Sequence, residues 1–198
     1  MNETDVDVRA DFDRAVEEFG RRVRATPPAG DAMWSRPTPC AEWDVRDLVG
    51  HLVGELRWMP PLLEGRTIAE VGGALDGDLL GADPHAAWDG AVTEVDAALS
   101  APGVLDRTVH LSYGDRPAAD YVAEVTSDLT VHSWDLARGI GADDRIDPHL
   151  VERAHARVAP MAKEIGESGM FGTPVDVGDD ADLQTRLLAV VGRDAGAR

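Results

Sequence analysis

The chain has 198 residues, of which 43% are hydrophobic and 5% aromatic, and its formal net charge at pH 7 is -18. This length is sufficient for one domain with a substantial core. The negative charge would repel phosphate backbones and anionic membrane surfaces, so we expect neither nucleic acid nor a membrane as a partner. The polar, acidic start and the lack of an apolar run approaching about 18 residues favour a cytoplasmic protein. The single cysteine, Cys40, agrees with a reducing compartment.

Helical periodicity dominates the first third of the chain. Apolar residues at helical spacing predict a first helix over about 6–25, and the proline- and glycine-containing stretch 26–30 ends it. A second helix should begin after Asp44, because this side chain can accept hydrogen bonds from the free amides of a first turn. Asp47 in that turn favours the positive end of the helix. The prolines at 60–61 should kink or end the second helix, since proline lacks the amide donor.

The middle of the chain alternates irregular and helical patterns. The glycine-rich, acidic stretch 72–83 shows no sustained period and is expected to form a loop. A third helix is predicted over 83–100, with Pro84 as its first residue. The stretch 108–111 is expected to be extended at best, and 114–117 is expected to turn the chain.

The last third of the chain contains three further helical patterns. A long apolar stripe predicts a fourth helix over 118–138, which Gly139 would close. A fifth helix is expected from 147 towards 165, kinked at Pro160, and the stretch 183–191 has the pattern of a short docking helix. Four principal helices with short or moderate connections predict an all-α four-helix bundle with an additional C-terminal helix. Bundles build metal sites from inward side chains on facing helices.

Three side chains in these helices form a candidate metal site. Asp128 and His132 are four residues apart, so a helix places both on one face, one turn apart. His51 and Asp128 stand where the helical pattern calls for apolar residues, and burial of an unpaired carboxylate costs several kcal/mol. Two imidazoles and one carboxylate suit Zn²⁺, Ni²⁺ or Fe²⁺, and three ligands leave a coordination position open. The alternative is coincidence, because a lone histidine on an apolar face is more often a core residue.

Other polar residues have more than one interpretation. Glu55, one turn after His51, is a candidate fourth ligand, general base or partner of an imidazole N–H, or an exposed carboxylate. Cys40 is either a reactive thiol or, as we favour, a small buried hydrophobe. Asp135 and Arg138 are expected to form an ion pair or a cap. Arg193 is a candidate anchor for an anionic group of a substrate. Four tryptophans are expected in the core or along a pocket: Trp34, Trp43, Trp58 and Trp134.

Two segments of the chain resemble a known family. The residues over 38–52, TPCAEWDVRDLVGHL, and over 128–138, DLTVHSWDLAR, resemble the N-terminal domain of mycothiol-dependent maleylpyruvate isomerase, within the DinB/YfiT-like metal-binding superfamily. The residues over 187–194, LLAVVGRD, give a weaker match. The resemblance implies a single DinB-like domain over 1–198 with an up-down-down-up bundle. It also implies a divalent metal, usually zinc or nickel, held by three ligands: His51, Asp128 and His132.

The resemblance has two departures. The isomerase adds a C-terminal sterol-carrier-like domain, for which this chain is too short, and its carboxylate ligand is a glutamate where this chain has Asp128. Characterised relatives include isomerases and thiol S-transferases that use mycothiol, bacillithiol or glutathione. We therefore expect this chain to share the metal site of the family more readily than its isomerase activity.

The combined expectation is a metal-dependent enzyme that activates a mycothiol-like thiol for S-transfer to, or isomerisation of, a small electrophilic substrate. A thiol in the open position would lose its proton to the charge of the ion. The alternatives are a hydrolase or biosynthetic enzyme that uses metal-bound water, or a non-catalytic metal-binding protein. We expect a monomer or a homodimer.

Overall fold

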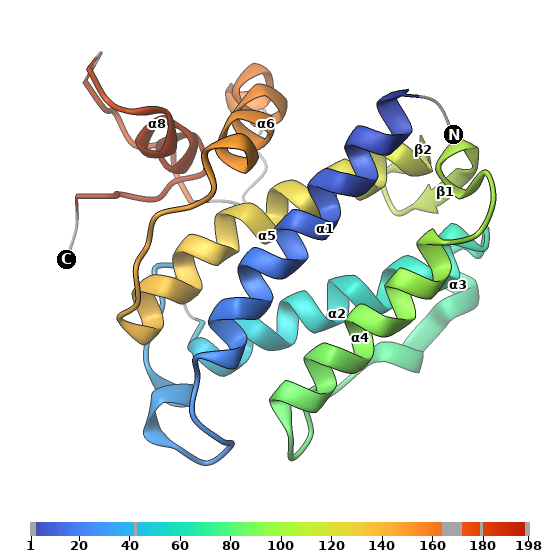
Figure 1. Ribbon diagram of the computed structural model, residues 1–198, viewed down its shortest axis with the longest axis horizontal. Coiled ribbons are helices and arrows are strands. Elements are labelled where there is room, and N and C mark those ends of the chain that lie inside the picture. The colour runs from blue at the N-terminus through green and yellow to red at the C-terminus, as the bar shows by residue number, and fades with distance from the viewer. Residues whose placement is uncertain (1–2, 42, 164–171, 179, 197–198) are drawn as a thin grey trace.

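Four long helices form the body of the protein. The computed structural model describes residues 3–41, 43–163, 172–178 and 180–196; Glu42, in the first motif, and Ile165 lie outside them. The long helices pack in two pairs, α1 against α5 and α2 against α4, with further packing between α2 and α5 (Figure 1). The expected all-α four-helix bundle is therefore confirmed. These helices are α1 (Glu3–Arg24), α2 (Val45–Leu63), α4 (Pro84–Leu99) and α5 (Ala118–Ile140).

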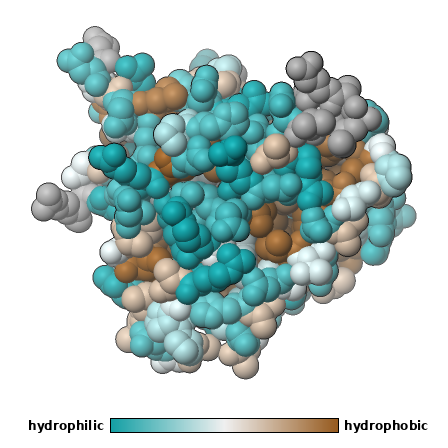
Figure 2. Space-filling model, in the orientation of Figure 1, coloured by the Kyte–Doolittle hydropathy of each residue, from teal (hydrophilic) through white to brown (hydrophobic). Residues whose placement is uncertain are grey.

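The bundle is held by the apolar stripes of these helices, which meet in one core. Phe19 of α1, Leu52 of α2, Trp88 of α4 and Leu129 of α5 are among its fully buried side chains. Removal of such surfaces from water is the main force that stabilises the bundle. The outer face in Figure 2 is mainly hydrophilic, with apolar side chains visible in its hollows. None of the described helices is long and apolar enough to cross a membrane.

The start of α2 follows the prediction. Asp44 Oδ1 accepts a hydrogen bond from the Asp47 amide at 2.9 Å, and Asp47 Oδ2 accepts one from the Asp44 amide at 3.1 Å. This reciprocal cap fixes the first turn of the helix. The helix does not end at Pro60 and Pro61 but continues to Leu63. Each proline removes one amide donor, and the burial of Leu62 and Leu63 in the core offsets this loss.

The end of α5 differs from the prediction by two residues. Gly139 lies inside the helix, and the cap is Gly141, whose φ of 74° is the left-handed conformation that glycine adopts without strain. A Cβ at position 139 would lie 3.0 Å from Val45 Cγ2 and 3.1 Å from Thr38 Cγ2. Gly139 therefore allows α5 to approach the beginning of α2 closely, and this approach brings the two site-bearing helices together.

Short elements connect the long helices. The stretch 72–83 is mostly irregular, as expected, although it begins with a 3-10 turn over Gly72–Leu75. The prediction of a turn over 114–117 is wrong, because this stretch is strand β2 (Gly114–Pro117), which pairs antiparallel with β1 (Thr108–Leu111). The chain reverses between Leu111 and Gly114. A further short helix, α3 (Ile68–Val71), follows α2.

Two helices from the C-terminal part pack beside the bundle. They are α6 (Pro148–Val158) and α8 (Leu183–Val190), which contact each other at one side of α5 (Figure 1). The expected docking helix is therefore present. The helix that was expected to run towards 165 ends at Val158, and Pro160 lies in the 3-10 turn that follows, where its missing donor is tolerated.

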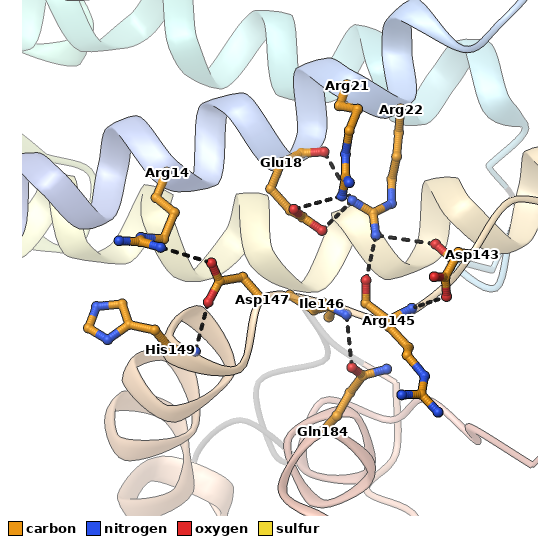
Figure 3. Close-up of polar contacts among 10 residues, drawn as sticks. All are labelled: Arg14, Glu18, Arg21, Arg22, Asp143, Arg145, Ile146, Asp147, His149 and Gln184. Carbon is orange, nitrogen blue, oxygen red and sulfur yellow. Dashed lines mark hydrogen bonds and ion pairs between the residues drawn. The ribbon is translucent and has the colours of Figure 1, made fainter.

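Polar contacts fix the connection between α5 and α6 (Figure 3). Arg22 of α1 donates to the carbonyl oxygens of Asp143 at 3.3 Å and Arg145 at 2.8 Å. From the other side, the Gln184 side chain of α8 accepts from the Ile146 amide and donates to the Asp144 carbonyl, both at 3.0 Å. The connection is thereby tied to both α1 and α8.

Candidate metal centre

The three candidate ligands, which come from two helices, meet at one point. His51 lies in the second turn of α2, and Asp128 and His132 lie one turn apart in α5. Nε2 of His51 is 3.1 Å from Asp128 Oδ2, and Nε2 of His132 is 3.4 Å from Asp128 Oδ1. One donor atom from each residue lies within 4.8 Å of the other two. Two imidazoles and a carboxylate that converge in this way fit a divalent metal ion.

The electrostatics of this cluster also suit a positive charge. Burial alone would raise the pKa of Asp128, but the adjacent His132 and His51 hold it well below its usual range. Burial disfavours the His132 imidazolium, yet the charge of Asp128 and a hydrogen bond to Asp135 outweigh it and raise the pKa of His132 to about 9. The metal-free cluster therefore carries an ionised carboxylate next to a cationic imidazole at neutral pH.

The other nitrogen of His132 contacts a residue whose role sequence reasoning missed. Asp135 is fully buried, and its Oδ2 lies 2.9 Å from His132 Nδ1. The same oxygen accepts a hydrogen bond from Arg193 Nη2 at 2.9 Å. The expected pairing of Asp135 with Arg138 is wrong, because Asp135 faces the interior, whereas Arg138 pairs with Asp144 at 3.1 Å. The available signal was the spacing of Asp135, three residues after His132 on a helix.

Aromatic and thiol groups surround the two imidazoles. The Trp43 ring lies with its centroid 4.7 Å from that of His51 and 5.7 Å from that of His132, so it packs against both. Cys40 is half-buried rather than fully buried, and its sulfur lies within 4.8 Å of donor atoms of His132 and Asp135. Burial raises the pKa of the Cys40 thiol, although Arg193 opposes this effect. The Cys40 side chain is therefore mainly a protonated, neutral thiol.

A cavity of about 720 Å³ opens beside the cluster. Trp43 and three residues of α2, His51, Glu55 and Trp58, line it, together with residues of the 75–80 stretch. Glu55 is half-buried, and its carboxylate does not belong to the three-donor group. Burial, followed by the charge of Asp128, raises the pKa of Glu55. Trp34 and Trp134, by contrast, are buried in the core.

Comparison with known proteins identifies the family. Two uncharacterized proteins of Mycobacterium tuberculosis, from strains CDC 1551 and H37Rv, are each 33% identical over 146 residues, which is 66% of this chain and 70% of theirs. No solved structure matches the chain significantly. A family described as the mycothiol maleylpyruvate isomerase N-terminal domain matches residues 12–137, which include the three-donor cluster but not Arg193. The chain therefore belongs to this family, within the metal-binding DinB-like superfamily.

Proposed function

We propose that the protein is a divalent-metal-dependent enzyme that activates a small thiol of the mycothiol type for S-transfer to, or isomerisation of, an electrophilic substrate. The observation that carries the proposal is the position of His51, which belongs both to the three-donor cluster and to the wall of the cavity. The cavity volume lies within the range of small-molecule sites, about 300–1,000 Å³. We further propose that residues 1–198 act as a single domain.

The proposed ligands are the residues of the cluster. His51, Asp128 and His132 would hold Zn²⁺ or Ni²⁺, and three protein ligands leave at least one position for a thiol. When bound, the ion would supply the positive charge that lowers the pKa of the thiol. No protein nucleophile is required, which agrees with the neutral state of the Cys40 thiol.

Glu55 has the position and the basicity to move protons in this reaction. It lies one turn after His51 on α2 and lines the cavity. Because its pKa is raised, its carboxylate accepts a proton more readily than an exposed glutamate. In our proposal, Glu55 takes the proton of the thiol, and the sulfur forms a bond to a carbon of an electrophilic double bond of the substrate, whose π-electron pair moves to the adjacent atom. Glu55 then returns the proton to that atom. In isomerisation, rotation about the new single bond is followed by the reverse steps: Glu55 removes this proton, the double bond re-forms and the carbon–sulfur bond breaks, which releases the thiol.

The lining of the cavity favours a neutral, hydroxyl-rich thiol. It contains three carboxylates, from Asp47, Glu55 and Asp78, and one guanidinium, from Arg46, which already pairs with Asp78 at 2.8 Å. This charge disfavours an anionic thiol such as glutathione. The carboxylates can accept hydrogen bonds from hydroxyl groups, and Trp43 and Trp58 provide flat apolar surfaces. Mycothiol, a sugar-containing thiol, suits these walls best.

The test uses the protein loaded with Co²⁺. Mycothiol should produce a sulfur-to-cobalt charge-transfer band, since a thiolate ligand suits this type of site. Glu55→Gln should retain the band but transfer sulfur to a model electrophile more slowly. Glu64→Gln, at the exposed C-terminal end of α2, is the matched control and should behave as wild type. The absence of a band with mycothiol, bacillithiol or glutathione at millimolar concentration would reject a thiol-activating function.

A further inference from the structure

A buried ion pair joins the C-terminal segment to the candidate metal centre. Arg193 follows α8, in the segment 187–194 that resembles the family only weakly and beyond the range 12–137 that matches it, yet its side chain is only 6% exposed. It donates to Asp135 Oδ2 at 2.9 Å and to the Val191 carbonyl at 2.7 Å. Asp135 is fully buried, so this guanidinium supplies the positive charge that its carboxylate needs inside the protein.

Asp135 in turn determines how the His132 ring presents its nitrogens. Its Oδ2 bonds to Nδ1 at 2.9 Å, whereas Nε2 faces Asp128 at 3.4 Å. Because a carboxylate accepts hydrogen bonds, Nδ1 carries the hydrogen and Nε2 is directed to the donor cluster. Metal-binding histidines commonly have such a carboxylate partner, which fixes the tautomer and the orientation of the ring.

The backbone around Arg193 holds this side chain in place. Gly192 has a φ of 77°, and a Cβ at this position would overlap the backbone of Gly172. The Val175 amide donates to the Ala189 carbonyl at 2.9 Å, so the 172–175 stretch is bonded to the end of α8. Gln184 and Arg22 then connect α8 through the 143–146 stretch to α1 (Figure 3). The position of the guanidinium therefore depends on a chain of contacts that ends in the bundle.

We propose that Arg193 and Asp135 are positioning residues for His132, so that the C-terminal segment sets the metal affinity of a cluster located in the bundle. This inference rests on the metal ligands of the proposed function, but not on the thiol reaction. Arg193 fixes the Asp135 carboxylate by charge and by hydrogen bonding, and Asp135 fixes the ring. Loss of such an outer partner typically lowers metal affinity by about 10- to 100-fold.

The experiment measures the pH-independent Co²⁺ affinity, on the alkaline plateau of the binding curve, by competition with a chelator in the full chain, without any thiol. Arg193→Met and Asp135→Ala should each weaken binding by about 10- to 100-fold. Arg193→Lys keeps the positive charge but not the planar guanidinium. It should therefore lose less Co²⁺ affinity than Arg193→Met. Arg153→Met is the matched control, because Arg153 of α6 likewise pairs with a buried aspartate, Asp11 of α1, at 2.8 Å, and this pair is not part of the cluster. It should bind Co²⁺ as wild type does.

A second readout separates positioning from general stability. In the Co²⁺ protein, the hydrogen on His132 Nδ1 should give a shifted proton NMR signal that is present in H₂O and absent in D₂O. Asp135→Ala should abolish this signal, Arg193→Met should broaden it by exchange, and Arg153→Met should leave it unchanged. If Arg193→Met unfolds, the double variant Asp135→Asn/Arg193→Met removes both charges and should still show weakened binding.

Two results would overturn the inference. One of them leaves the proposed function intact, and the other rejects it as well. Wild-type affinity and a sharp proton signal in Arg193→Met would show that the arginine serves stability alone, and the proposed function would stand. Failure of the wild-type protein to bind Co²⁺ would reject the ligand set and the proposed function together with the inference.

Discussion

Metal binding should depend on pH through His132. Its pKa of about 9 in the metal-free protein means that the imidazole is cationic at pH 7, whereas a metal ligand must be neutral. At pH 7, about one molecule in 100 would have the neutral ring, which lowers the apparent affinity by about 100-fold, or about 3 kcal/mol. The apparent association constant should therefore rise about tenfold per pH unit from pH 7 to 9 and level off above pH 9. Asp128 does not contribute to this pH dependence of the association constant, because its pKa is held well below this range.

The measurement is a competition titration of Zn²⁺ against a chromophoric chelator at half-unit steps of pH, with the chelator's own protonation taken into account. Asp135→Asn is an informative variant, since the hydrogen bond and charge of Asp135 help to raise the pKa of His132. In this variant the plateau should begin at a lower pH. An affinity that stays constant between pH 7 and 9 in the wild-type protein would refute the assignment of a cationic His132 in the metal-free state.

Three further predictions concern the ligands, the apo protein and the C-terminal segment. Single substitutions of His51, Asp128 or His132 by alanine should each abolish stoichiometric metal binding, measured by elemental analysis; a full equivalent of metal in all three would exclude the site. Chelation should lower the melting temperature by mass action but leave the helical circular dichroism intact, because the apolar core does not depend on metal; loss of helix would show a structural metal. Gly192→Ala should destabilise the fold by about 1–3 kcal/mol in urea unfolding, through strain at positive φ and overlap with Gly172; wild-type stability would contradict the close crossing there.

The features that local sequence determines could be predicted well. The Asp44 and Asp47 cap, the helices of the bundle and the one-turn spacing of Asp128 and His132 depend on residues within a few positions of one another. The meeting of His51 with this pair required the additional assumption of a bundle, which the structure confirms. The metal itself and the role of Glu55 remain predictions.

The features that were missed depend on contacts between distant segments. Nothing local indicates that Asp135 pairs with Arg193, because 58 positions and an irregular stretch separate them. Similarly, the sequence offers two glycines near the end of α5, and only the packing of Gly139 against Thr38 and Val45 shows that Gly141 is the cap. Proline rules placed the end of α2 too early because they do not include the burial of Leu62 and Leu63.

The boundary of the family match and the physical boundary of the fold do not coincide. The match ends at residue 137, which would cut α5 before its last turn and leave Arg193 behind. A fragment with these limits would separate the Asp135 carboxylate from the guanidinium that pairs with it, and the loss of one partner of a buried pair costs about 3–5 kcal/mol where the remaining charge stays buried. That cost is a large part of the stability of an ordinary domain. Recombinant fragments of this protein should therefore extend through the arginine, and a fragment designed from the family limits should be poorly folded even though it retains all three candidate ligands.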